Sequence, residues 1–206
     1  KGLISPLDFI SLAEETGLII NIGHWVIDTA CKKICEWHKK HNISVNVAVN
    51  VSVKQFVNHD FPNKVQDILS HYNLPPKYLQ LEVTESMLME SADSAVNMLT
   101  RLHQLGLSLA IDDFGTGYSS LQYLGSFPID CVKIDRSFIT GLGQDKKSET
   151  IVKAILAMAK GLGLSVVAEG IELKEQAKML ETFNCDYAQG YFYSRPLEEI
   201  QFLEFI

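Results

Sequence analysis

The chain has 206 residues and a mass of 23.1 kDa, and its 47% hydrophobic and 21% charged residues exclude a disordered protein. The formal net charge of −7 argues against binding through a broad basic face, so no nucleic acid polymer is expected as a partner. No apolar run reaches the ~18 residues of a membrane helix, and the first residues lack the hydrophobic core of a signal peptide. Four scattered cysteines fit buried thiols in a reducing compartment, which predicts a cytoplasmic location.

Apolar runs typical of strands alternate with helical patterns along the chain. Helices are expected at about 5–17, 24–40, 65–72, 91–105, 119–124, 151–162 and 173–183, and from Pro196 onward. Strands are expected at 45–51, 79–83, 107–111, 131–134, 165–168 and 186–193. Six strands that are each followed by a helix indicate an α/β fold with a parallel sheet, either open or closed as a barrel. With no Pro-rich linker, residues 1–206 are expected to form one domain.

Polar residues lie where the apolar strands stop, and in a parallel barrel these strand ends converge on one face. The residues at these positions are Asn50, Glu82, Asp112, Asp113, Lys133, Glu169 and Gln189. Each residue alone has a structural explanation, as a helix cap, an ion pair or a turn residue. Six strands that all end in this way favour a shared site.

Crowded carboxylates need cations to stay ionised, and oxygen ligands of this kind select Mg²⁺ or Mn²⁺. Two such ions would offset four negative charges and could activate a water for attack on a phosphodiester. Bound cations would also let an acidic protein bind an anionic substrate.

The segment Asp112-Asp113-Phe114-Gly115-Thr116-Gly117-Tyr118-Ser119-Ser120-Leu121 resembles the signature loop of the EAL domain, a bacterial cyclic di-GMP phosphodiesterase family. Five further motifs match that family in order along the chain. They are Asn50-Val51-Ser52, Glu82-Val83-Thr84-Glu85, Val132-Lys133-Ile134-Asp135, Ala168-Glu169-Gly170-Ile171-Glu172 and Gln189-Gly190-Tyr191.

The resemblance implies a TIM-barrel-like (β/α) fold and hydrolysis of cyclic di-GMP to linear 5′-pGpG with two Mg²⁺ or Mn²⁺ ions. The metal ligands that it implies are Asn50, Glu82, Asp112, Asp113 and Glu169, with Asp112 bridging the two ions. Lys133 would position the attacking water, Glu169 would help to activate it, and Glu85 would anchor the loop 114–121. Gln189, Gly190 and Asp113 would line the substrate pocket.

The resemblance also implies a homodimer through the loop 114–121 and the adjacent helix, and sensor or diguanylate cyclase domains in the parent protein. The family's Glu-Ala-Leu motif normally stands upstream of a segment like Gly2-Leu3-Ile4-Ser5-Pro6 and is absent from this sequence. The chain is therefore expected to be an N-terminally truncated domain that lacks the first two of the family's eight strands.

Two alternative functions differ from that of a phosphodiesterase. A catalytically inactive receptor module would bind cyclic di-GMP without turnover. An enolase-type barrel would stabilise an enolate on Mg²⁺, but the loop 112–121 has no role in that chemistry.

Overall fold

The computed structural model describes residues 4–117 and 121–206, and it falls into two compact units. Unit 1 comprises Lys1–Ala110 and Ser119–Ile129, and unit 2 comprises Ile111–Tyr118 and Asp130–Ile206. Strand β3 (Ser108–Phe114) begins in unit 1 and ends in unit 2. The expectation that residues 1–206 form one domain stays a prediction. None of the helices in the described ranges is both long and apolar enough to cross a membrane.

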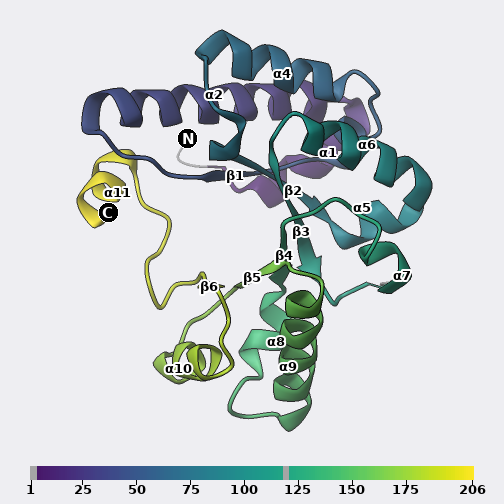
Figure 1. Ribbon diagram of the computed structural model, residues 1–206. Helices are drawn as coiled ribbons and strands as arrows, with labels where there is room; N and C mark the ends of the chain where they lie inside the picture. The colour runs from purple at the N-terminus through teal and green to yellow at the C-terminus, as the bar shows by residue number, and fades with distance from the viewer. Residues whose placement is uncertain (1–3, 118–120) are drawn as a thin grey trace. The chain divides into compact units, whose positions relative to one another are not determined.

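Unit 1 is built on two parallel strands, β1 (Val47–Asn50) and β2 (Leu79–Thr84), and on seven helices of the described residues. These helices are α1 (Ile10–Thr16), α2 (Leu18–His41), α3 (Val53–Phe56), α4 (Phe61–Tyr72), α5 (Glu85–Glu90), α6 (Ala92–Gln104) and α7 (Leu121–Leu124). Two 3₁₀ turns, η1 (Pro6–Asp8) and η2 (Pro76–Tyr78), complete it. In Figure 1, α4 runs alongside the long helix α2, and the two helices are in contact.

The core of unit 1 forms around β2, whose residues Leu79, Leu81 and Val83 are fully buried. Helix α6 presents Leu99 and Leu102, which are also fully buried, one helical turn apart on one face. Because alternate residues of a strand share a face, Leu79, Leu81 and Val83 form one apolar face of β2, and this face is covered in the core of unit 1.

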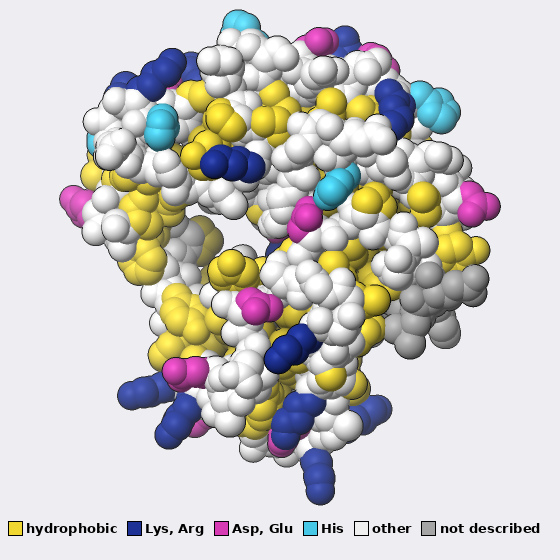
Figure 2. Space-filling view, in the orientation of Figure 1, with side chains coloured by type: hydrophobic (Ala, Val, Ile, Leu, Met, Phe, Trp, Pro, Cys, Tyr) yellow, Lys and Arg dark blue, Asp and Glu magenta, His cyan; other side chains and the backbone are white. Residues whose placement is uncertain are grey.

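Unit 2 contains three strands in parallel pairing, β4 (Cys131–Ile134), β5 (Ser165–Ala168) and β6 (Tyr187–Ala188), with β5 in the middle. Its helices are α8 (Arg136–Thr140), α9 (Lys146–Gly161), α10 (Lys174–Thr182) and α11 (Glu199–Phe205). Figure 1 shows α8 beside α9, and α9 packs against β4 and β5. Lys and Arg side chains gather on the part of the surface that α9 and α10 form, at the bottom of the view in Figure 2.

Side-chain caps fix where the unit 2 helices begin. Asp135 accepts a hydrogen bond from the Ser137 amide at the start of α8. Asp145 accepts from the amides of Lys147 and Ser148 at the start of α9, and these bonds lower the pKa of its carboxyl. The acidic residues before these helices therefore stabilise otherwise unsatisfied amide groups.

The structure confirms the predicted strands 131–134 and 165–168 residue for residue, together with the parallel α/β class. It also confirms helix ends at Gly17 and near Gly106, which adopt the positive φ angles of 78° and 86°. The third strand runs on to Phe114, so Asp112 and Asp113 lie inside it. Residues 119 and 120 of the predicted helix 119–124 lie outside the described residues, and α7 covers the remainder.

One predicted strand was wrong in length, and the short helices α3, α5 and α8 were not predicted. The predicted strand 186–193 is only Tyr187–Ala188, because the chain turns at Gly190, whose carbonyl accepts hydrogen bonds from the amides of Tyr193 and Ser194. Helix α3 was missed, since it is only four residues long and is specified by a reciprocal cap between Ser52 and Gln55 rather than by hydrophobic periodicity.

All four cysteines are free thiols, and Cys31 and Cys131 are buried as expected, whereas Cys35 and Cys185 are partly exposed. Burial, together with nearby Cys35 and Asp28, raises the pKa of the Cys31 thiol to about 12. The Cys31 thiol is therefore protonated at neutral pH.

The first prediction concerns Gln176, which is 3% exposed and ties α10 to α8. Its Oε1 accepts from the amides of Glu172 and Leu173, and its Nε2 donates to the Ile139 carbonyl at 3.0 Å. Because Gln176→Leu leaves these backbone groups unsatisfied, we expect it to lower the free energy of unfolding by about 2–3 kcal/mol. Urea denaturation measures this loss, and the exposed Gln104→Leu should leave the midpoint nearly unchanged.

Candidate functional site

The strand ends of unit 1 bring Asn50 and Glu82 side by side. The two residues are register partners in the parallel pair β1–β2, and the Val51 amide donates to the Glu82 carbonyl at 2.9 Å. Residues in register on parallel strands point to the same side of the sheet. Glu82 is only 5% exposed, whereas Asn50 is exposed. This end of unit 1 therefore holds a buried carboxylate next to an amide.

Glu85 follows the same strand and is the first residue of α5, where its side chain is 1% exposed. A carboxylate near a helix N-terminus is stabilised by the unsatisfied amide groups there. The loop that Glu85 was expected to anchor includes residues 118–120, which lie outside the described residues. Its role as a loop anchor stays a prediction.

In unit 2, the ammonium group of Lys133 lies between two carboxylates. Its Nζ is 3.2 Å from Asp112 Oδ1 and 2.7 Å from Glu169 Oε1, and the Lys133 side chain is 7% exposed. Asp112 comes from the end of β3, Lys133 from β4, and Glu169 follows β5 directly. Three strand ends that are far apart in the sequence thus converge on one cluster, as their positions in the sequence predicted.

Asp113 continues β3 in an unusual backbone conformation, with a φ angle of 54°. Few residues other than glycine adopt this left-handed region, although Asp and Asn tolerate it best. The Asp113 amide donates to Asp112 Oδ1 at 3.0 Å, and Thr116 Oγ1 donates to the Asp113 carbonyl at 2.7 Å. These two bonds hold the backbone of Asp113 on both sides.

The charge environment of Asp113 shows that this edge is crowded with carboxylates. Partial shielding from water, followed by the carboxylates of Asp112 and Asp135, raises the pKa of the Asp113 carboxyl, and Lys133 opposes this effect. Asp135 was not singled out from the sequence, although its place two residues after Lys133 was the available signal.

Gln189 and Gly190 follow β6 and are fixed by backbone contacts. The Gln189 amide donates to the Ala168 carbonyl at 2.8 Å, and its carbonyl accepts from the Ile171 amide at 3.1 Å. A Cβ atom on Gly190 would lie 2.2 Å from the Ile171 carbonyl oxygen, so no larger residue fits there. The Gln189 side chain is exposed and available to a ligand.

The donor atoms in both units are the oxygen ligands that Mg²⁺ and Mn²⁺ prefer. In unit 2, the carboxylates of Asp112, Asp113 and Glu169 outnumber the single ammonium of Lys133, which leaves an excess negative charge that a divalent ion would offset. The residues therefore fit such an ion in chemical type. Within residues 4–117 and 121–206, no group of three or more His, Cys, Asp and Glu is arranged to hold a metal. The metal ligand set stays a prediction.

Comparison with known proteins identifies the class of domain that carries these strand-end residues. The EAL domain family matches residues 1–196, and the chain belongs to this family. It is 48% identical over 201 residues to the signaling protein YkoW of Bacillus subtilis, and covers 25% of that protein. It is 43% identical over 202 residues to the bifunctional diguanylate cyclase/cyclic di-GMP phosphodiesterase MucR of Pseudomonas aeruginosa, and covers 30% of it. These alignments each cover 98% of the chain.

Solved structures agree with this assignment. A MucR phosphodiesterase in complex with c-di-GMP superposes with a TM-score of 0.94 at 43% identity, over 98% of this chain and 81% of that one. The EAL domain of Mycobacterium smegmatis DcpA gives a TM-score of 0.85 at 38% identity, over 90% of this chain and 83% of that one. The likeness confirms the TIM-barrel-like fold class. The chain spans about a quarter to a third of the curated relatives' own length.

The second prediction tests the Lys133 cluster through stability. Lys133→Met removes the cation from two largely buried carboxylates, and we expect it to lower the free energy of unfolding by about 3 kcal/mol in metal-free buffer. Urea denaturation in that buffer measures this loss. Adding Asp112→Asn and Glu169→Gln to Lys133→Met should recover part of the loss. A triple variant as unstable as the single one would contradict this account.

Proposed function

We propose that this domain hydrolyses cyclic di-GMP to linear 5′-pGpG with the help of divalent metal ions. The observation that carries the proposal is the Lys133 ammonium within 3.2 Å of Asp112 and Glu169, at the converging ends of three strands. Membership of the EAL family supports it. Relatives named as cyclic di-GMP phosphodiesterases, NbdA of P. aeruginosa and PdeR of Escherichia coli, are 41% and 38% identical to the chain.

The proposed metal ligands are those that the family resemblance implied. In unit 1 they are Asn50 and Glu82, which are already neighbours in register. In unit 2 they are Asp112, Asp113 and Glu169, with Asp112 as the bridging carboxylate. Two Mg²⁺ or Mn²⁺ ions would supply charge stabilisation for the attacking and leaving oxygens of the phosphodiester.

The chain's own residues orient the water and handle its proton. The Lys133 ammonium carries three N–H donors and is held in place by the two carboxylates, so it can fix the position of a water through a remaining donor. Glu169 lies next to that donor and can accept the proton that the water loses. The water oxygen bonds to phosphorus, the P–O3′ bond breaks, and the 3′ oxygen takes up a proton, which gives a free 3′-hydroxyl and a 5′-phosphate.

Substrate recognition is assigned to Gln189, Gly190 and Asp113. The exposed amide of Gln189 can donate and accept hydrogen bonds, and Gly190 lets a ligand approach the backbone closely. We also propose a homodimer through the loop 114–121 and the adjacent helix, of which residues 118–120 lie outside the described residues. Sensor or diguanylate cyclase domains in the parent protein and a cytoplasmic location remain proposals of the same kind.

The third prediction addresses catalysis. Because Asp112 contacts Lys133 and is the proposed bridge between the ions, Asp112→Asn should lower kcat/KM for cyclic di-GMP by at least about a hundredfold. Chromatographic detection of pGpG in Mn²⁺ buffer measures this. The matched control is Asp93→Asn, an exposed carboxylate in the first turn of α6. Full activity of the Asp112→Asn variant would contradict the proposed mechanism.

Calorimetry together with the same chromatographic assay distinguishes the inactive receptor module from the phosphodiesterase. If the unaltered chain binds cyclic di-GMP by calorimetry but yields no pGpG in either Mg²⁺ or Mn²⁺, the receptor function holds and hydrolysis by this chain is excluded. Turnover above a metal-free control excludes the receptor function instead.

The fourth prediction concerns metal removal. Dialysis against EDTA should abolish pGpG formation, and adding Mn²⁺ or Mg²⁺ in excess should restore it, since the carboxylates are the oxygen donors that these ions select. Zn²⁺ should restore less activity, because the set contains no Cys or His ligand. Activity that persists in EDTA would overturn the metal requirement.

A further inference from the structure

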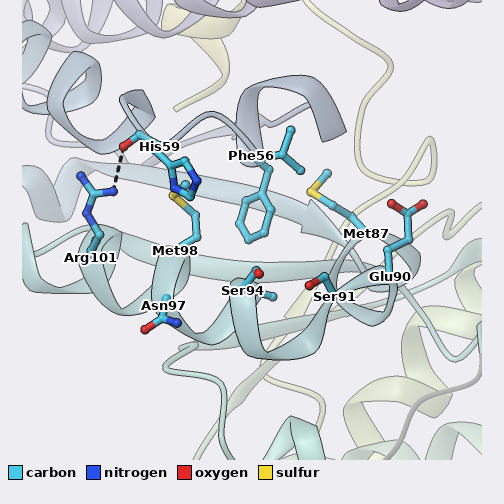
Figure 3. Close-up of a pocket in the computed structure, with 11 residues that line it drawn as sticks. Phe56, His59, Met87, Glu90, Ser91, Ser94, Asn97, Met98 and Arg101 are labelled. Atoms are coloured by element: carbon cyan, nitrogen blue, oxygen red, sulfur yellow. Dashed lines mark hydrogen bonds between the residues drawn. The ribbon is translucent and has the colours of Figure 1, made fainter.

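A pocket of about 390 Å³ lies in unit 1, between residues 56–59 at the end of α3 and the helices α5 and α6. None of the proposed metal, catalytic or substrate-binding residues lines it. The volume is within the range of ~300–1,000 Å³ that is usual for ligand pockets. Figure 3 shows Phe56, from α3, pointing into the space above α6, between Met98 and Met87.

The floor of this pocket is apolar and adaptable. Phe56, Met87 and Met98 are each about 95% buried, and their remaining exposed atoms line the cavity. Methionine side chains are flexible and polarizable, so they fit apolar groups of different shapes. The floor therefore suits apolar side chains of a ligand rather than one rigid shape.

The two ends of the pocket carry opposite charges. Glu90 lies at the end of α5, and Arg101 lies near the end of α6, on opposite sides of the view in Figure 3. Arg101 Nη1 donates to the His59 carbonyl at 2.7 Å, which fixes the guanidinium while other N–H donors remain. A ligand that matches this pocket needs an anionic group at one end and a cationic group at the other.

Serine hydroxyls line the pocket between the charged ends. Ser91 stands at the N-cap position of α6 but makes no side-chain capping hydrogen bond, and Ser94 follows on the same helix. Both residues are exposed and lie beneath Phe56 in Figure 3. Their hydroxyls can donate to and accept from the polar groups of a ligand.

The length between the ends limits the size of the ligand. Ser91, the residue after Glu90, lies ten positions before Arg101, which corresponds to a rise of about 15 Å at 1.5 Å per residue. An extended peptide advances about 3.3 Å per residue, so about four residues span this distance. A tetrapeptide with free termini also carries the required opposite charges at its two ends.

From the apolar floor, the two hydroxyls and the opposite charges at Glu90 and Arg101, we propose that this pocket binds a short apolar peptide with free termini. The peptide carboxylate pairs with Arg101, the peptide ammonium pairs with Glu90, and its apolar side chains lie on Phe56, Met87 and Met98. The hydroxyls of Ser91 and Ser94 bond to the peptide backbone. This proposal does not depend on the phosphodiesterase activity.

The test titrates the tetrapeptide Ala-Leu-Phe-Ala into the full chain and measures its binding by isothermal titration calorimetry. We expect the free-ended peptide to bind, and the same peptide with an acetylated N-terminus and an amidated C-terminus to bind at least about tenfold more weakly. Arg101→Gln and Glu90→Gln should each weaken binding of the free-ended peptide by about tenfold. Neither variant should alter binding of the capped peptide by a comparable factor.

Two tryptophan variants separate pocket binding from adsorption elsewhere. Ser94→Trp fills the cavity from an exposed helix position and should abolish binding, whereas Gln104→Trp, exposed on the same helix but outside the pocket, should leave it intact. No binding to the unaltered chain, equal binding of the free and capped peptides, or binding that survives Ser94→Trp would each overturn the proposal. The circular dichroism spectrum of each variant checks that it is folded.

Discussion

The ion cluster of Lys133 with Asp112 and Glu169 is the interaction on which the architecture of unit 2 depends. A lysine that is 6% exposed in a strand with four buried residues is costly unless its charge is compensated. Compensation requires Asp112 of β3 and Glu169, the residue after β5, to reach the same point beside β4. The register of β4 and β5, with Lys133 opposite Val167, brings Glu169 within reach just past the end of β5.

The same cluster shows how neighbouring carboxylates are accommodated in the folded chain. The ammonium of Lys133 offsets part of the negative charge, and two hydrogen bonds support the left-handed backbone conformation of Asp113. Burial, followed by the carboxylates of Asp112 and Asp135, raises the pKa of the Asp113 carboxyl. Lys133 thus compensates part of the cluster's negative charge within unit 2, and the proposed metal ions would offset the remainder.

Much of this arrangement could be predicted from the sequence, for a physical reason. The strands 131–134 and 165–168 are mainly apolar, so a polar residue inside or directly after such a run stands out. Because parallel strands bring these positions to one edge, the sequence predicted that Asp112, Lys133 and Glu169 converge. The left-handed backbone of Asp113, the four-residue helix α3 and the early end of β6 could not be predicted in this way. They depend on single hydrogen bonds and on a close backbone contact at Gly190, which leave no periodic signal in the sequence.

The contact at Gly190 has a consequence for how this region can diverge among related domains. The segment after β6 is held by backbone groups, with the amides of Gln189 and Phe192 bonded to the carbonyls of Ala168 and Ile171. Since these bonds need no particular side chain, the exposed aromatic residues around the turn contribute little to holding it. Tyr187, Tyr191, Phe192 and Tyr193 are 40–63% exposed and form such a surface. Substitution of these exposed aromatic residues can therefore change the preference of this surface for a ligand or partner. Gly190 and the path of the backbone need not change with it.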